Sequence, residues 1–264
     1  MKEAIARTTL VGILIAAILL PGCAATVPIP RLINGSGKIV TKELDFTDFT
    51  YVEVGSVFEV EIVESGSYLT SITADDNLFT YIKASQEGKT LKIHLTPTYN
   101  YSGVTLKAKI TLPKLSGIHL YGATNGTIRG FQSSNDFNLQ LSGASQLSMN
   151  MAAGNTVFEM SGATKVTGSL KAHDTKFRVS EASIVELEGL ADKVVLNASG
   201  ASKLKLIDFP VDEADVTLSG ASEVVIKVSG RLDVILTGAS KLSYKGDPMI
   251  GVIMISDASA IERK

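Results

Sequence analysis

Four acidic residues are the side chains of this sequence that come nearest to a catalytic set. Asp208, Asp212, Glu213 and Asp215 lie close together, with Pro210 between the first two. Paired carboxylates supply the acid and the base or nucleophile of glycoside hydrolysis, and carboxylate oxygens also bind calcium. The spacing lacks the alternating Asp-x-Asp-x-Asp-Gly pattern of calcium loops. The pattern therefore favours a solvated loop over a catalytic or calcium-binding site.

The other reactive side chains also lack partners at useful spacing. Serine is abundant, but a serine nucleophile needs a base within reach. His94, His119 and His173 lie far apart in the sequence; we expect His119 to point outward from a strand and His173 to lie in a connection. Gly35-Ser36-Gly37 follows no predicted strand and is too short for a phosphate-binding loop. The sequence therefore predicts no catalytic residue, no metal site and no cofactor.

The single cysteine, Cys23, follows an apolar run and is expected to carry lipid. Residues 8–20 form an uncharged run of 13 residues, shorter than the roughly 20 that a membrane-spanning helix needs. After the basic Lys2 and Arg7, this run is typical of a secretory signal peptide. Leu20-Pro21-Gly22-Cys23 resembles a bacterial lipobox, in which the cysteine becomes the lipidated first residue of the mature chain. The alternative is an uncleaved membrane anchor.

We therefore expect a signal peptide over residues 1–22 and acyl chains, palmitate among them, on Cys23, which together would anchor the chain stably. Residues 23–34 would form a tether, kept out of regular structure by Pro28 and Pro30. In lipoproteins, Ala24 after the cysteine implies sorting to the outer membrane if the cell has one. The expected location is the bacterial cell envelope, and the membrane is the expected partner.

Composition narrows the function further. The chain has 264 residues with 23 glycines, 45% hydrophobic residues and no tryptophan, which is too apolar for a disordered chain. The net charge is −2, and no basic stripe is present. The sequence therefore predicts no binding to nucleic acid.

An internal repeat fills the second half of the chain. Ser-Gly-Ala-Ser and close variants recur eight times, with steps of 18 to 21 residues. The shared alanine stands at Ala123, Ala144, Ala163, Ala182, Ala201, Ala221, Ala239 and Ala258. Apolar residues alternate with other residues before and after each copy, as in Leu139-x-Leu141 and Phe158-x-Met160. Alternation with period two indicates strands with one buried face. Only the first copy breaks the pattern, at Gly126 and Thr127.

Short strands that recur every 19 or so residues predict the coils of a β-solenoid, stacked about 4.8 Å apart. Equivalent residues then form ladders up the stack. We expect a positive φ at the glycine position, where Glu181 fits poorly. We also expect the alanines to fill a corner that is too tight inside for anything larger. The serines and threonines on either side are expected to hydrogen-bond along their ladders.

Both ends of such a stack need covering. Residues 35–113 are predicted to form a β-rich N-terminal cap with strands at 51–54, 57–63, 91–95 and 105–112. A short helix with an aspartate cap is predicted at 76–83. Residues 114–264 would form the regular repeats, and the charges of Glu262-Arg263-Lys264 would end the last strand. Residues 35–264 are therefore expected to form one domain.

The chain resembles the bacterial head GIN domain family, which is described as adhesin-like and has no agreed catalytic residues. The resemblance covers roughly residues 46–261. It rests on Phe49-Thr-Tyr-Val-Glu-Val-Gly-Ser-Val-Phe-Glu-Val-Glu-Ile, on the Ala74-Asp-Asp-Asn-Leu and Tyr81-Ile segments, on Ile110-Thr-Leu-Pro-Lys-Leu and on the repeated Leu-Ser-Gly-Ala-Ser units. The resemblance implies a right-handed β-helix on an exported, often lipid-anchored protein. With the eight repeats, the expected fold is an all-β, parallel β-solenoid of about eight coils of about 19 residues.

Two function classes remain, together with a weaker third. The first is a non-enzymatic, lipid-anchored envelope protein that uses the solenoid wall for adhesion or as a structural spacer, with a glycan or another surface protein as partner. The second is a β-helical polysaccharide lyase or glycoside hydrolase. The third is an ice-binding face of ordered hydroxyls. The repeat positions present Ser, Thr, Lys, Gln and Glu in mixture, which favours the first class. The sequence does not name the ligand-binding residues or the oligomeric state.

Overall fold

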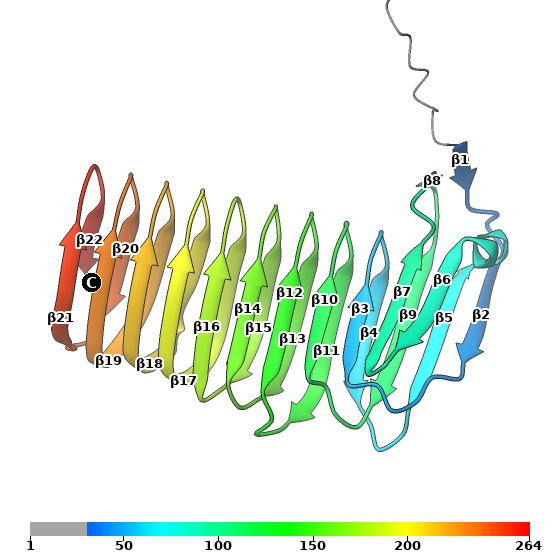
Figure 1. Ribbon diagram of the computed structural model, residues 1–264, viewed down its shortest axis with the longest axis horizontal. Coiled ribbons are helices and arrows are strands. Elements are labelled where there is room, and N and C mark those ends of the chain that lie inside the picture. The colour runs from blue at the N-terminus through cyan, green and yellow to red at the C-terminus, as the bar shows by residue number, and fades with distance from the viewer. Residues whose placement is uncertain (1–30) are drawn as a thin grey trace, which may run out of the picture.

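The structure is a computed structural model that describes residues 31–264, and it is an elongated β-solenoid (Figure 1). Within these residues it holds strands and a single 3-10 turn. The eight predicted repeats are built from these strands: β10 (Gly117–Leu120), β11 (Asn125–Gln132), β12 (Phe137–Leu141), β13 (Gln146–Ala152), β14 (Thr156–Met160), β15 (Lys165–Lys171), β16 (Asp174–Val179), β17 (Ile184–Ala198), β18 (Lys203–Leu218), β19 (Glu223–Leu236), β20 (Lys241–Lys245), β21 (Met249–Ile255) and β22 (Ala260–Arg263). No described helix is long and apolar enough to cross a membrane.

Each coil contributes one segment to each of two parallel sheets, which we call the β12 wall and the β13 wall. The β12 wall contains β10, β12, β14, β16 and β21, together with the second halves of β17, β18 and β19. The β13 wall contains β11, β13, β15, β20 and β22, together with the first halves of the same three strands. The predicted β-solenoid of about eight coils of about 19 residues is therefore confirmed.

The core lies between the two walls and consists of the alternating apolar residues that the sequence singled out. Phe158 and Phe177 pair in register on β14 and β16, both fully buried, with ring centroids 4.9 Å apart. Gly126 pairs with Leu147, so it continues the inward ladder instead of interrupting it. A Cβ at Gly126 would lie 2.6 Å from Leu120 Cδ1, so neighbouring leucines fill the space. The irregularity of the first repeat is instead a bulge at residues 129–132.

The repeated corner has the predicted backbone conformation at the glycine position. All eight residues there have φ between 59° and 87°, including Glu181 at 62° and Asp257 at 59°. The alanine after each of them donates its N–H to the carbonyl of the equivalent residue one coil earlier, as Ala163 does to Gly143 at 2.8 Å. A Cβ at Gly162 would lie 2.3 Å from the same carbonyl. Close backbone approach therefore favours glycine at this position.

The expected orientation of the alanine ladder is wrong. All eight alanines are exposed, whereas the serine or threonine that follows each one lies on the inner side, buried in seven copies. The inner hydroxyl often turns back to its own corner, as Ser145 Oγ does to the carbonyl of Ser142 at 3.0 Å. Only some hydroxyls bond along the ladder, as Thr164 and Ser183 do at 2.9 Å. Nothing in the described contacts explains why alanine fills the outer position in every copy.

The N-terminal region contributes coils as well as a cap. Its elements are β1 (Arg31–Asn34), β2 (Ile39–Leu44), β3 (Tyr51–Val54), β4 (Glu59–Glu64), β5 (Leu69–Asp75), η1 (Asp76–Thr80), β6 (Ile82–Glu87), β7 (Thr90–Leu95), β8 (Tyr99–Ser102) and β9 (Leu106–Leu112). Strands β3 and β4 stack directly on β10 and β11 as a further parallel coil. Strands β7 and β9 extend both walls by another layer on the far side of that coil. The cap itself is the antiparallel addition of β6 to β7, of β5 to β9 and of β2 to β5.

Two sequence predictions for this region are corrected. Residues 31–34, assigned to the tether, form strand β1 and pair in parallel with β8. The predicted helix is a five-residue 3-10 turn, followed at Ile82 by strand β6. Asp75 does not cap this turn. Its buried carboxylate instead accepts the backbone N–H groups of Gly37 at 2.7 Å and of Thr105 at 2.8 Å, which joins two loops.

Candidate functional site

The β13 wall presents two outward ladders on every coil. The first contains Asn125, Gln146, Lys165, Ile184, Lys203, Glu223, Lys241 and Ala260. The second contains Thr127, Ser148, Thr167, Glu186, Lys205, Val225, Ser243 and Glu262, of which Ser243 is buried. Strand pairing sets each of these residues directly beside the next one in its ladder. Their chemistry therefore forms a continuous surface along the solenoid.

Most charged residues of this wall are paired with each other. Glu186 lies between Lys165 at 2.8 Å and Lys205 at 2.6 Å. Hydrogen bonds from these two ammonium groups lower the pKa of Glu186 to about 2. On the N-terminal side, Glu61 pairs with Arg129 at 3.1 Å. The charges therefore largely satisfy one another and leave little net field along the wall.

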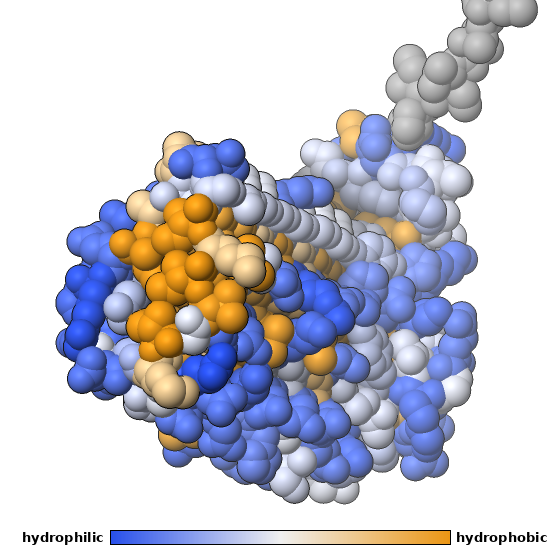
Figure 2. Space-filling model, turned by 60° about the vertical axis from the view of Figure 1, so that its left-hand side comes forward, coloured by the Kyte–Doolittle hydropathy of each residue, from blue (hydrophilic) through white to orange (hydrophobic). Residues whose placement is uncertain are grey.

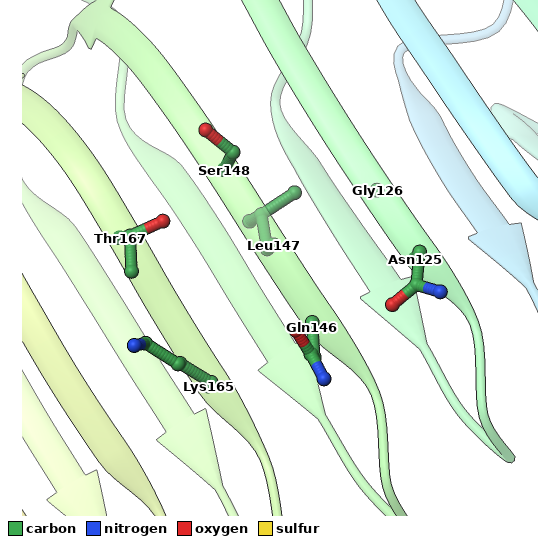
Figure 3. Close-up of a pocket in the computed structure, with 7 residues that line it drawn as sticks. All are labelled: Asn125, Gly126, Gln146, Leu147, Ser148, Lys165 and Thr167. Carbon is green, nitrogen blue, oxygen red and sulfur yellow. The ribbon is translucent and has the colours of Figure 1, made fainter.

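Between these ion pairs lies a patch without charge, which we call the amide–hydroxyl patch: Asn125, Thr127, Gln146, Ser148 and Thr167. None of the five side chains has a hydrogen-bond partner within residues 31–264. Four of the five line a shallow depression of about 370 Å³ over β11, β13 and β15, with Gly126 and Leu147 at its base and Lys165 at its margin (Figure 3). The patch therefore offers amide and hydroxyl groups that are not already used by the protein.

This arrangement suits a neutral ligand with many hydroxyl groups. Asparagine and glutamine each present both a donor and an acceptor, and serine and threonine hydroxyls can act as either. The depression is open, so it does not exclude water as catalysis usually requires. A long polymer could contact several equivalent coils at once, because the wall repeats along its length. The patch is therefore an open surface of repeated donor and acceptor groups.

The β12 wall carries an aromatic group near its N-terminal end. His119 lies outward beside Tyr121, with ring centroids 5.2 Å apart, as its strand position predicts. Burial lowers the pKa of His119, an effect that the nearby Glu53 opposes. Tyr51 packs where Gly117 leaves room, since a Cβ there would lie 2.5 Å from the tyrosine ring. Burial and nearby carboxylates raise the pKa of Tyr51 to about 12. The tyrosine is therefore a neutral part of this wall at physiological pH.

The four acidic residues found in the sequence lie on strand β18, not in a loop between coils, and this corrects the loop prediction. Strand β18 bends where it passes from the β13 wall to the β12 wall. At this bend Phe209 and Val211 point inward, and the acidic side chains point outward. Lys193 pairs with Asp215 at 3.0 Å and with Glu213 at 3.4 Å. Asp212 accepts a hydrogen bond from Ser229 at 3.2 Å. No group of three or more metal-ligating side chains occurs among the described residues.

The remaining sequence candidates are separated in space or used structurally. His173 lies in the connection between β15 and β16, as predicted, and its Nδ1 contacts Asp192 Oδ2 at 2.8 Å. His94 lies on β7, which is separated from the His119 strand β10 by β3. The Gly35-Ser36-Gly37 loop is held by its own contacts, since Ser36 Oγ donates to Asp76 at 2.7 Å. Cys23 and the predicted signal peptide lie outside the described residues.

Sequence analysis did not identify the amide–hydroxyl patch. Its members are ordinary polar residues in the first three repeats, and equivalent members lie 19 to 21 residues apart in the sequence. Reading the outward positions of each repeat as columns would have found it. Two such columns start at Asn125 and Thr127. In the first three repeats these columns hold one charged residue, Lys165, whereas each of the later repeats holds at least one.

Comparisons with known proteins agree with the geometry of the fold. A family model described as "Putative auto-transporter adhesin, head GIN domain" matches residues 48–248. No curated protein matches the chain.

Three solved structures illustrate the shared fold. A protein from Parabacteroides distasonis ATCC 8503 described as a putative lipid binding protein has a TM-score of 0.79 at 21% identity, over 89% of this chain and 100% of that chain. A putative adhesin from the same organism has a TM-score of 0.77 at 16% identity, over 89% and 100% of the two chains. A putative adhesin from Bacteroides fragilis NCTC 9343 has a TM-score of 0.70 at 19% identity, over 88% and 100%.

Proposed function

The chain belongs to the head GIN domain family of putative auto-transporter adhesins, and from this premise we propose that it is a non-enzymatic binding protein of the bacterial cell envelope. Its ligand is a neutral, hydroxyl-rich polymer such as a glycan, which binds along the β13 wall. A lipid on Cys23 holds the protein at the membrane, and the folded solenoid is exported.

The observation that carries the binding proposal is the amide–hydroxyl patch. Its side chains are free of hydrogen bonds within the described residues, whereas the acids on either side are paired with lysine or arginine. A hydroxyl-rich ligand can replace the water on these side chains with hydrogen bonds of similar strength. Three of the four acids around Pro210, the strongest enzymatic candidates, are instead engaged: Glu213 and Asp215 with Lys193, and Asp212 with Ser229.

The proposal of export and lipidation rests on the sequence. The apolar run before Cys23 has the length of a signal peptide core, and the cysteine is the only thiol of the chain. Seven residues separate Cys23 from Arg31, where strand β1 begins. The eight Cα–Cα steps from Cys23 to Arg31 span at most about 29 Å when the chain is fully extended. The N-terminal cap would therefore stand close to the membrane surface.

The binding proposal is tested by measuring retention of the full chain, in mild detergent, on an array of neutral glycans. The test variant is Gln146→Ala combined with Ser148→Ala, which removes two groups from the middle of the patch. The matched control is Glu159→Ala combined with Arg178→Ala, which removes an exposed ion pair on the β12 wall, away from the proposed binding surface. We expect the test variant to weaken binding about tenfold, as two lost hydrogen bonds imply, and the control to bind like the wild type. Equal binding by all three proteins, or no retention at all, would contradict the proposal.

The anchor is tested separately, with Cys23→Ser in the full chain. If Cys23 carries the lipid, this variant accumulates as an uncleaved precursor or is released from the membrane fraction, and the mass of the attached acyl chains is lost. A variant that is processed to the same mass and stays in the membrane fraction would show that the lipoprotein assignment is wrong. The glycan measurement is unaffected by this result.

A further inference from the structure

The C-terminal end of the solenoid exposes its own core. In strand β21, Met249 and Met254 are 63% and 60% exposed, and Ile250, Val252, Ile253 and Ile255 are between 41% and 45% exposed. Figure 2 shows these residues as one apolar patch that is surrounded by polar residues at this end of the molecule. Apolar patches of this extent usually mark interaction sites in soluble domains.

Three isoleucines of the patch continue buried ladders, whereas Met249 and Met254 follow the exposed Arg231 and Ile235 on the outer face. Ile253 follows Val216 and Val234, which are 2% and 1% exposed. Ile255 follows Leu236, and Ile250 follows Leu232, and both leucines are fully buried. Each inward position is therefore covered on one side by its own chain and open on the other. The surface that would complete it is another β-layer with apolar inward residues.

The charges expected to close this end do not cover it. Arg263 pairs with Asp247 at 3.1 Å, and Glu262 pairs with Lys241 at 3.1 Å. Glu262 and Arg263 both belong to strand β22 on the β13 wall. Strand β21 itself carries no charged residue between Met249 and Ile255. Natural edge strands are commonly protected by charges, bulges or covering loops. The only such device on β21 is a bulge between Ile250 and Ile253.

The opposite end of the described solenoid is closed, because antiparallel strands β5 and β6 cover the edges of β9 and β7. Within residues 31–264, only the C-terminal end of the solenoid is therefore open in this way. Head-to-tail stacking needs two complementary open ends and would grow into a fibre. A contact between two identical ends uses the open end of both copies, so assembly ends at the dimer.

We propose that the C-terminal end is a homotypic docking surface, at which β21 of one copy pairs with β21 of a second copy about a two-fold axis. A two-fold axis perpendicular to the β12 wall makes the two β21 strands antiparallel and keeps their inner faces on the same side. One register then sets Met249 opposite Met254 of the second copy, and Ile250 opposite Ile253. Ile250 and Ile253 both face inward, since they pair with buried Leu232 and Val234. The register therefore joins inward residues to inward residues and extends the core across the contact.

The size of the surface agrees with a two-copy contact. The exposed fractions of the β21 side chains correspond to an area on the order of 600 Å² per copy, so the pair buries at most about 1,200 Å², the lower end of specific interfaces. The backbone groups on the free edges of β21 and β22 add hydrogen bonds to this contact. The proposal needs neither the export nor the glycan binding proposed above.

The first experiment measures the mass of the full chain in mild detergent by light scattering, with the detergent contribution subtracted. The test variant is Met249→Lys combined with Met254→Lys; both side chains are already well exposed, and pairing would set lysine beside lysine. The control is Leu190→Lys, which places a charge at an apolar residue that is 45% exposed and far from the end. We expect dimers for the wild type and the control, and folded monomers with the circular dichroism spectrum of the wild type for the test variant. A monomeric wild type, larger assemblies, or dimers in all three would overturn the proposal.

A second experiment tests the register. In a Cys23→Ser background, which has no other thiol, Met249→Cys in one tagged copy is mixed with Met254→Cys in an untagged copy and oxidised. The proposed pairing gives a disulfide between tagged and untagged chains, because directly opposed residues lie within disulfide reach. In the control, an untagged Leu190→Cys copy takes the place of the Met254→Cys copy, and we expect no disulfide between tagged and untagged chains. Equal cross-linking with the control, or none with the Met254→Cys copy, would show that the ends do not pair in this way.

Discussion

Replacing Phe158 with alanine should cost about 3–5 kcal/mol of the free energy of unfolding. The ring is fully buried and lies 4.9 Å from that of Phe177 on the next coil. Strands on both sides hold β14 at a fixed spacing by backbone pairing with β12 and β16. The coils therefore cannot close around the missing ring, and the cavity remains, which favours the upper part of the range.

The measurement is equilibrium unfolding in urea, followed by circular dichroism, for Phe158→Ala and for its neighbour Glu159→Ala. Glu159 points outward and pairs with Arg178 at 2.6 Å, with both side chains nearly half exposed. Exposed ion pairs contribute only about 0–1 kcal/mol, so Glu159→Ala should shift the midpoint slightly. For Phe158→Ala, a loss of about 4 kcal/mol at a slope of about 2–3 kcal/mol per M corresponds to a shift of about 1.3–2 M. Equal shifts for the two variants would refute the assigned alternation of inward and outward residues.

Two further predictions concern the corner and the wall. Glu181→Gly should stabilise the protein by about 1 kcal/mol in the same unfolding assay, because Glu181 holds a φ of 62° that costs a non-glycine residue energy; a destabilised variant would refute this account of the corner. Lys165 and Lys205 hold the pKa of Glu186 at about 2, below its ordinary value of 4.5. Its contribution to stability is therefore complete above about pH 4.5 and is lost as the pH falls towards 2. Because the group is partly exposed, the contribution is small, and Glu186→Gln should flatten the stability–pH curve only within that window.

The repeat made most of the solenoid predictable. Eight copies with alternating apolar flanks fix the strand faces, and Phe158 beside Phe177 follows from the ladder alone. The orientation of the corner did not follow, because alternation predicts faces only within strands. At the turn, the positive φ at the glycine position breaks the alternation, so the alanine lies outside and the following hydroxyl lies inside.

The N-terminal region was less predictable because its chain order differs from its spatial order. Strands β3 and β4 lie between β7–β9 and β10–β11, although β7 and β9 come later in the chain than β3 and β4. The coil formed by β3 and β4 also lacks the repeated tetrapeptide, with Ser56 at the positive-φ position. For the candidate site, sequence analysis correctly placed His119 and His173. The patch around Gln146 becomes visible in the sequence only when the outward positions of successive repeats are aligned as columns.

The central claim is that this protein binds a hydroxyl-rich polymer without cleaving it, and one experiment tests both parts. The full chain is incubated with the glycans that it retains, with calcium present, and bound protein and new reducing or unsaturated ends are measured in the same samples. We predict retention without any product. Product that forms with the wild type and disappears with Asp212→Asn or Asp215→Asn would contradict the claim and identify a lyase or hydrolase instead.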